Sequence, residues 1–82
     1  MKFEDLKFEP KEFTRGNQAI VWFDNGYGAS VIDDGYGREK GLYELAVLDD
    51  CGVNCYTEIT SDVAGYLSPE DVTNLLERIE SL

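Results

Sequence analysis

Histidine is absent from this chain of 82 residues, and cysteine, proline and basic residues are scarce. Without histidine the chain has no Ser-His or Cys-His pair, and it lacks the commonest general base of enzymes. Pairs of carboxylates remain, but a chain of this length has little volume for the deep cleft that carboxylate catalysis on sugars requires. We therefore expect a protein that is not an enzyme and has no catalytic residues.

Positive charge is also scarce, because 7 Lys and Arg stand against 17 Asp and Glu, which gives a net charge of −10 at neutral pH. Nucleic-acid binding draws its affinity from cationic side chains, so direct binding to DNA or RNA is not expected. The imbalance is uneven: residues 1–40 hold 8 acids and 6 bases (−2), whereas residues 41–82 hold 9 acids and 1 base (−8). A partner that is guided by charge would meet the C-terminal half.

The two cysteines, Cys51 and Cys55, are too few for a disulfide-stapled secreted domain and, without histidine, for a zinc site within one chain. No run of acids has the spacing of a calcium loop. The first residues are charged, and no apolar run approaches the 18 or so residues of a membrane span. We predict no metal, no cofactor, no membrane contact and a cytoplasmic location.

The patterns that are present predict a single α+β domain over residues 1–82. Residues 1–17 indicate an extended arm with aromatic anchors, and the spacing over residues 3–7 is also compatible with one helical turn. Residues 18–58 predict an antiparallel β-meander of three to four strands. Residues 68–82 predict a C-terminal helix that packs on one face of the sheet.

The strands of the meander are predicted from β-branched and aromatic runs that end at turn residues. Asn25-Gly26 is the strongest hairpin signal and ends a first strand that starts at Gln18. Return strands are expected over residues 28–33, 42–48 and 53–57. The glycine-rich, charged run 33–41 cannot pack as a strand interior and predicts an exposed loop, and residues 59–67 are expected to form a partly irregular bridge.

The clearest local signal is Ser68-Pro69-Glu70-Asp71, which offers an N-cap hydroxyl, proline at the first helical position and two acids beside the positive end of the helix dipole. A helix should therefore begin at Pro69, with one apolar stripe that covers a sheet face. The predicted core is Ile20, Trp22, Val31, Leu45, Val47, Val63, Leu67, Val72, Leu75, Leu76 and Ile79.

Two Gly-Tyr-Gly triplets raise the question of a phosphate loop, but no helix follows either of them directly, and turns that need positive φ explain the glycines better. The five tyrosines and one tryptophan are a stronger signal, since these residues are enriched where proteins meet. Tyr27 and Tyr36 lie in turns and are expected to be exposed. The alternative is that the aromatic residues cap the open ends of a small sheet. The candidate partner-binding residues are Tyr27, Tyr36, Asp33, Asp34, Asp49, Asp50, Glu77 and Glu80.

Three phrases of the sequence resemble a group of small uncharacterised proteins of tailed bacteriophages and prophages. They are Asn25-Gly-Tyr-Gly-Ala-Ser-Val31, Gly41-Leu-Tyr-Glu-Leu-Ala-Val-Leu48 and Ile59-Thr-Ser-Asp-Val-Ala-Gly-Tyr-Leu67. Where that group carries Tyr-Asp-Thr-Pro-Ile-Thr, this chain has Tyr56-Thr57-Glu58-Ile59-Thr60. The resemblance implies a viral accessory protein that acts inside a bacterium, and it implies no activity for any residue.

Together these features predict a small acidic accessory protein, a non-enzymatic module that engages a host or phage protein and masks a basic surface on it. The alternative is a small structural homo-oligomer, for which a homodimer is the simplest form. One helix can cover only one side of the sheet, so apolar residues on the other side would favour self-association or a partner.

Overall fold

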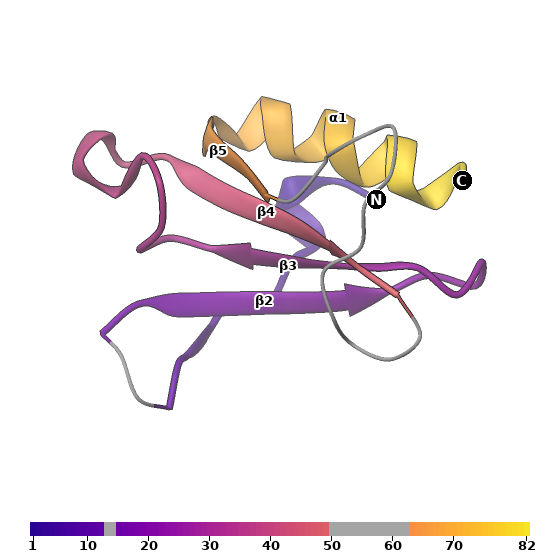
Figure 1. Ribbon diagram of the computed structural model, residues 1–82, viewed down its shortest axis with the longest axis horizontal. Coiled ribbons are helices and arrows are strands. Elements are labelled where there is room, and N and C mark those ends of the chain that lie inside the picture. The colour runs from indigo at the N-terminus through magenta and orange to yellow at the C-terminus, as the bar shows by residue number, and fades with distance from the viewer. Residues whose placement is uncertain (13–14, 50–62) are drawn as a thin grey trace.

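The computed structural model describes residues 1–12, 15–49 and 63–82 of the chain and gives an α+β fold (Figure 1). Five antiparallel strands form one sheet in the order β1-β2-β3-β4-β5, and a C-terminal helix packs on it. The elements are η1 Phe3–Asp5, β1 Glu9–Pro10, β2 Asn17–Trp22, β3 Gly28–Ile32, η2 Arg38–Lys40, β4 Tyr43–Leu48, β5 Val63–Leu67 and α1 Pro69–Glu80.

The sheet has more strands than the three to four expected from the sequence. The N-terminal arm contributes β1, which pairs with the start of β2. Residues 63–67, expected as part of an irregular bridge, form β5 and pair with β4. The arm also contains the 3-10 helix η1, within the range where one helical turn was considered. The strand predicted over residues 53–57 lies outside the described residues.

The predicted hairpin turn at Asn25-Gly26 joins β2 to β3. Phe23 N–H donates to the Tyr27 carbonyl at 2.8 Å, and Gly26 N–H donates to the Phe23 carbonyl at 3.2 Å. Gly26 has φ 89°, which is why glycine is preferred there. The Asn25 side chain reaches the far end of α1, where its Nδ2 donates to the carbonyl of Ile79 at 2.9 Å. The turn is therefore tied to the helix C-terminus.

The helix begins at Pro69, as predicted. Asp71 N–H donates to Ser68 Oγ and Ser68 N–H donates to Asp71 Oδ2, both at 3.1 Å, so the two residues cap the helix start reciprocally. The apolar stripe enters the core, where Val72, Leu76 and Ile79 are fully buried. Each contributes about 1.5–3 kcal/mol of gross hydrophobic stabilisation.

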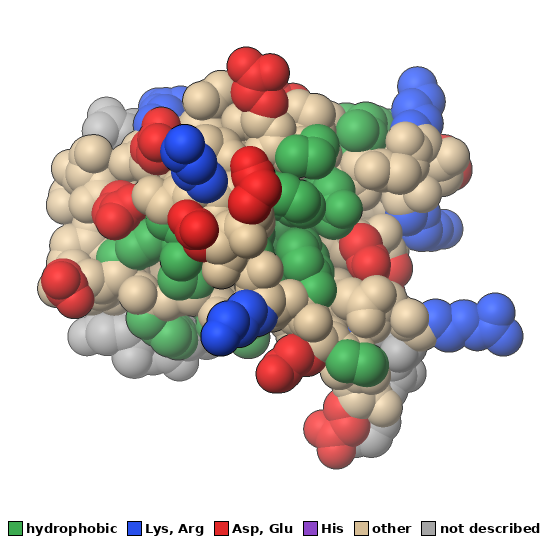
Figure 2. Space-filling model, turned by 180° about the vertical axis from the view of Figure 1, so that it is seen from behind, with side chains coloured by type: hydrophobic (Ala, Val, Ile, Leu, Met, Phe, Trp, Pro, Cys, Tyr) green, Lys and Arg blue, Asp and Glu red, His purple; other side chains and the backbone are tan. Residues whose placement is uncertain are grey.

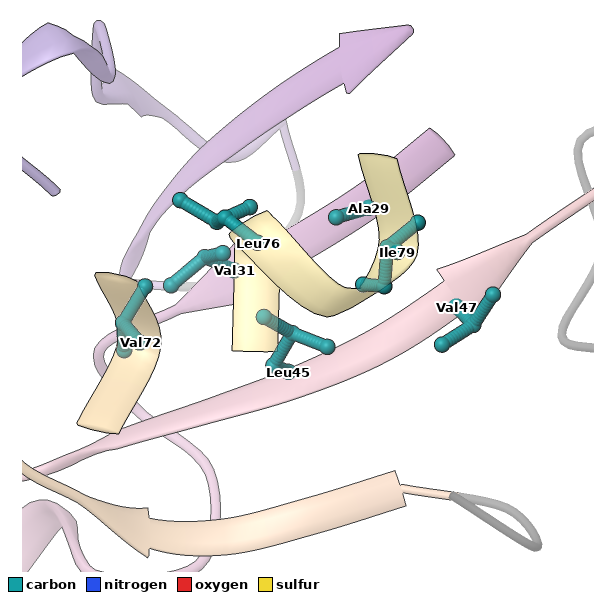
Figure 3. Close-up of a cluster of buried hydrophobic side chains, with 7 residues drawn as sticks. All are labelled: Ala29, Val31, Leu45, Val47, Val72, Leu76 and Ile79. Carbon is teal, nitrogen blue, oxygen red and sulfur yellow. The ribbon is translucent and has the colours of Figure 1, made fainter. Parts of the chain in front are cut away.

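The core lies between α1 and one face of β3 and β4 (Figure 3). Alternation along the strands places Ala29 and Val31 of β3, with Leu45 and Val47 of β4, on the helix side. The buried cluster is Ala29, Val31, Leu45, Val47, Val72, Leu76 and Ile79. Leu67 and Leu75 are partly buried against it. Eight of the eleven predicted core residues are thus confirmed, and the Val63 side chain lies outside what the structure describes.

The prediction was wrong for the remaining two, because Ile20 is 55% exposed and Trp22 is 49% exposed. The register of β2 with β3 pairs Ala19 with Val31 and Val21 with Ala29, so the smaller residues of β2 face the helix. Since side chains alternate, Ile20 and Trp22 fall on the opposite face of the sheet. The strand register decided which set points inward.

The N-terminal arm covers the rest of the helix side of the sheet. Phe3 and Phe8 pack with Tyr43, with ring centroids 4.9 and 5.7 Å from that of Tyr43. Phe3 N–H donates to Thr73 Oγ1 at 2.9 Å, which holds η1 beside α1. One helix and one arm together shield this face, which explains how a small sheet with a single helix can bury its core.

The loop between β3 and β4 is only partly exposed, in contrast to the expectation for residues 33–41. Arg38, Glu39 and Lys40 are exposed, whereas residues 33–35 are half-buried and Gly37 is buried.

Among the described residues, no helix has the length and apolar character needed to cross a membrane.

Candidate protein-binding surface

Tyr66 occupies an unusual backbone conformation in β5. Its φ of 57° is the single positive value at a non-glycine position among the described residues. Tyr43 pairs with Leu67 but Leu45 pairs with Ala64, so Gly65 and Tyr66 together lie opposite Glu44. This is a β-bulge, in which an extra residue bends the strand and re-aims a side chain. A left-handed conformation at a non-glycine residue costs about 1–2 kcal/mol, so packing around the bulge must offset that cost.

The loop that follows β3 is locked against this bulge. Tyr66 N–H donates to the Tyr36 carbonyl at 3.0 Å. A Cβ at Gly65 would lie 2.6 Å from Tyr36 Cβ, and a Cβ at Gly37 would lie 2.9 Å from Tyr66 Cα. Both glycines are therefore required by close backbone approach, and Gly37 also has φ 102°. The segments Tyr36-Gly37 and Gly65-Tyr66 therefore pack directly against each other, and a larger residue at either glycine would push them apart.

This contact leaves two tyrosine side chains exposed from a fixed backbone. Tyr36 is 65% exposed and Tyr66 is 53% exposed, and we call them the tyrosine pair. Tyr36 N–H also donates to Glu44 Oε1 at 3.4 Å, so the pair is connected to β4 as well as to β5. Tyrosine offers large rigid area and a hydroxyl group at low entropic cost, which suits a protein contact.

The exposure predicted for Tyr36 is confirmed, but Tyr27 is half-buried and packs against the core. Tyr27 also lines a surface hollow of about 240 Å³ together with Asn25, Gly26 and the candidate Asp49. The hairpin turn therefore uses Tyr27 mainly for packing. Asp50, which follows Asp49 in the candidate set, lies outside the described residues.

The candidates Asp33 and Asp34 lie in contacts that hold the sheet together. Asp33 accepts hydrogen bonds from the backbone N–H of Asn17 at 2.7 Å and from its Nδ2 at 2.9 Å. Asp34 Oδ1 accepts from Lys11 Nζ at 2.6 Å, in an ion pair whose side chains are 28% and 19% exposed, respectively. Because neighbouring groups already engage these carboxylates, their structural role is evident.

Glu77 and Glu80 are exposed on the last turns of α1. Glu80 Oε1 accepts a hydrogen bond from the Met1 ammonium at 2.8 Å and forms an ion pair with it. This bond raises the pKa of the ammonium above its ordinary value of 8.0. Glu80 therefore fastens the arm to the helix, whereas the Glu77 carboxylate projects from the surface.

The candidate residues do not converge on one place in the fold. The tyrosine pair lies where β5 meets the loop after β3. Asp49 lies beside the hairpin turn that Asn25 ties to the C-terminal end of α1, where the helix acids lie. Seen from behind, hydrophobic side chains gather in the middle of the surface and acidic side chains are spread around them (Figure 2). On this face the acidic side chains are thus spread out and form no single patch.

Sequence reasoning missed Tyr66, Ile20 and Trp22 as surface residues. The sequence around Tyr66 did contain a signal, because a glycine such as Gly65 within a strand-like run often marks a β-bulge. Neither Ile20 nor Trp22 had one, since only the register shows which side of β2 faces the helix. Their exposure adds an apolar stretch to a face that was expected to need covering.

A second hollow of about 270 Å³ lies beside β1 and β2 and is lined by Lys7, Glu9, Pro10, Gln18 and Ile20. Neither hollow brings two carboxylates together. Within the described part of the chain, no three Cys, Asp or Glu side chains lie close enough to hold a metal ion. Cys51 and Cys55 lie outside that part.

In comparisons with known proteins, no family model, no curated protein and no solved structure matches this chain.

Proposed function

We propose that this chain is a small acidic accessory protein of the phage type, a non-enzymatic module that binds a host or phage protein in the bacterial cytoplasm. The tyrosine pair carries the proposal. It is an exposed aromatic surface on a backbone that the β-bulge, two required glycines and a cross-loop hydrogen bond hold in place.

The physical case for binding at the tyrosine pair is one of preorganisation. A partner that covers two flexible side chains must first order their backbone, which weakens binding. Here the Tyr36 carbonyl and the Tyr66 N–H already bond to each other, so only the side-chain torsions remain to be fixed. Strain at a residue such as Tyr66, retained in spite of its cost, is typical of positions with a role beyond folding.

Charge supports a partner with a basic surface. The net charge of −8 in residues 41–82 would attract such a surface and would slow approach to nucleic acid. The last helix contributes exposed acids at Glu70, Asp71 and Glu77. We propose that the acids accelerate encounter with the partner and that the tyrosine pair holds it, so that its basic surface becomes masked.

The test is capture of a partner from bacterial lysate by the tagged chain, with the bound protein identified by mass spectrometry. The decisive variant is Tyr66→Gly, because it removes the ring and relieves the positive φ at once. We expect this variant to be at least as stable as the wild type and to lose most of the captured partner. Loss of binding without loss of stability separates recognition from folding.

Glu39→Gln is the matched control, because Glu39 is exposed in the same loop but lies outside the tyrosine pair. Capture at low and high salt then distinguishes the two contributions, since exposed charges are screened over about 10 Å at 0.1 M. A partner retained at high salt by wild type and lost by Tyr66→Gly supports the tyrosine pair. Equal capture by both proteins would refute the proposal.

A further inference from the structure

Among the described residues, nothing pairs with the backbone groups on the outer side of β2 beyond Gln18. On the side of β3, the Asn17 carbonyl accepts from Asp33 N–H, and Phe23 N–H donates to the Tyr27 carbonyl. Odd-numbered residues of β2 therefore bond to β3. On the other side the Gly16 carbonyl accepts from Lys11 N–H. Because backbone groups alternate along a strand, the N–H and C=O of Ile20 and Trp22 point away from the sheet.

The first strand covers this side only in part. β1 is two residues long and pairs with Asn17 and Gln18 alone. Throughout residues 1–12, 15–49 and 63–82, no strand pairs with the outer side of β2 beyond Gln18. The segment from Ile20 to Trp22 also lacks the lysine, proline or bulge that commonly protects an edge. It is a short edge that is open to a further strand.

The side chains at this edge are apolar and fixed in orientation. Ile20 and Trp22 share the face that α1 does not cover, and about half of each side chain is exposed. The Trp22 ring lies over Gly28, where an added Cβ would be 2.7 Å from its Cε3 atom. A strand that pairs with this edge would therefore meet an ordered apolar surface as well as free backbone groups.

Charge identifies a second copy of this chain as the occupant. The acids concentrate in residues 41–82, so a basic partner would be drawn there and away from β2. The strand from Asn17 to Trp22 carries no charged residue. Two copies of the chain, each with a net charge of −10, can therefore approach here with little local repulsion. Lys7 and Glu9 lie beside this edge, since both line the same hollow as Ile20.

A two-fold axis at Trp22 pairs the outward-facing backbone groups of the two copies. Two β2 strands in antiparallel register would place Trp22 opposite Trp22, with Cα atoms about 5.5 Å apart and two N–H···O bonds exchanged. Ile20 would then lie opposite Asp24 of the second copy. Because Lys7 and Glu9 line the same hollow as Ile20, the Asp24 carboxylate would approach a region that holds one ammonium and one carboxylate group, and symmetry repeats this contact. The register keeps β1 clear of the second strand.

We propose that the chain forms a weak homodimer by pairing the outer edges of two β2 strands, with Trp22 on the two-fold axis. The segment is short, so the interface falls below the roughly 1,200 Å² of standard stable complexes. Dimerisation should therefore depend on concentration. This inference does not rest on the tyrosine pair.

The test is sedimentation velocity of the full chain from about 10 μM to about 1 mM, the range for an interface of this size. We expect the mean mass of the wild type to rise toward twice that of the monomer. Trp22→Glu and Trp22→Lys should each remain monomeric at the highest concentration. Their equimolar mixture should associate again, because residue 22 of one chain faces residue 22 of the other.

Tyr36→Glu is the matched control, since it adds the same charge at an exposed aromatic residue away from the edge, and it should dimerise like the wild type. Circular dichroism of each variant verifies its fold. If a Trp22 variant does not fold, Ile20→Lys is used in its place. A wild type that remains monomeric throughout would overturn the proposal. So would Trp22→Glu that dimerises like the wild type, or single variants that are monomeric but do not associate when mixed.

Discussion

The Asn25 side chain connects two parts of the fold that are 54 residues apart in sequence. Its Nδ2 lies 2.9 Å from the carbonyl oxygen of Ile79 and 3.3 Å from those of Glu80 and Leu82. Its Oδ1 accepts from Tyr27 N–H at 3.0 Å within the hairpin turn. The last carbonyls of a helix lack partners within the helix, so this amide acts as a C-terminal cap supplied by a distant turn.

Two substitutions separate the contributions of this side chain. Asn25→Ala removes both the cap and the acceptor for Tyr27. An amide has two N–H hydrogens for three carbonyls, so loss of the cap alone removes about two net hydrogen bonds at about 0.5–1.5 kcal/mol each, or about 1–3 kcal/mol, and loss of the acceptor for Tyr27 adds to this. Asn25→Asp keeps the acceptor for Tyr27 but places a carboxylate against carbonyl oxygens at the negative end of the helix dipole. It should destabilise by at least as much.

The assay is urea and thermal unfolding followed by the fluorescence of Trp22, the single tryptophan of the chain. A loss of 1–3 kcal/mol corresponds to a fall of about 5–20 °C in the unfolding midpoint for a domain of this size. Asn74→Asp on the exposed side of α1 is the matched control and should change stability by less than about 0.5 kcal/mol.

The pH dependence of Asn25→Asp provides an independent measure. Carbonyl oxygens disfavour the charged carboxylate, so its folded pKa should rise above the unfolded value of about 3.9. The destabilisation is then full at neutral pH, and relative to wild type at the same pH it should shrink as the pH falls through the raised folded pKa toward the unfolded value of about 3.9. If Asn25→Asp unfolds with the wild-type midpoint at neutral pH, the amide does not cap the helix.

Two further changes test other contacts of the fold. Gly65→Ala introduces a Cβ that would lie 2.6 Å from Tyr36 Cβ, so unfolding should show a loss of about 1–3 kcal/mol, and a neutral effect would contradict the interlock at the bulge. Glu80→Gln removes the carboxylate charge that raises the pKa of the Met1 ammonium, so NMR titration should find that pKa nearer to 8.0 than in the wild type. Because the folded pKa of the ammonium is raised, the ion pair stabilises the wild type below pH 8, and this stabilisation is lost as the pH rises through the folded pKa. The free energy of unfolding of the variant should not show this fall with pH.

Local signals in the sequence were sufficient where chemistry acts over a few residues. The Ser68-Pro69 start of α1 is defined by a cap and a proline that need no distant partner. The turn at Gly26 follows from the backbone freedom of glycine. The apolar stripe of the helix has its own 3.6-residue period, so its buried side was predictable as well.

Pairing between distant segments was not predictable in the same way. Ile20 and Trp22 were expected in the core, but Ala19 and Val21 face the helix. A shift of one residue exchanges the two faces of a strand, and β2 is apolar on both, so its own pattern cannot choose. The strand that closes the sheet at β5 likewise depends on β4 for its bulge.

The sequence by itself determined the α+β class, the position of the helix, the first hairpin and the acidity of the C-terminal half, because each depends on composition or on neighbours along the chain. Tertiary structure alone decided that Tyr36 and Tyr66 are held together, that Asn25 caps a helix from across the domain, and that no strand of the described residues pairs with the outer side of β2 beyond Gln18. These features arise where residues far apart in sequence meet, and the free energy of packing the whole chain selects among registers that local preferences leave nearly equal.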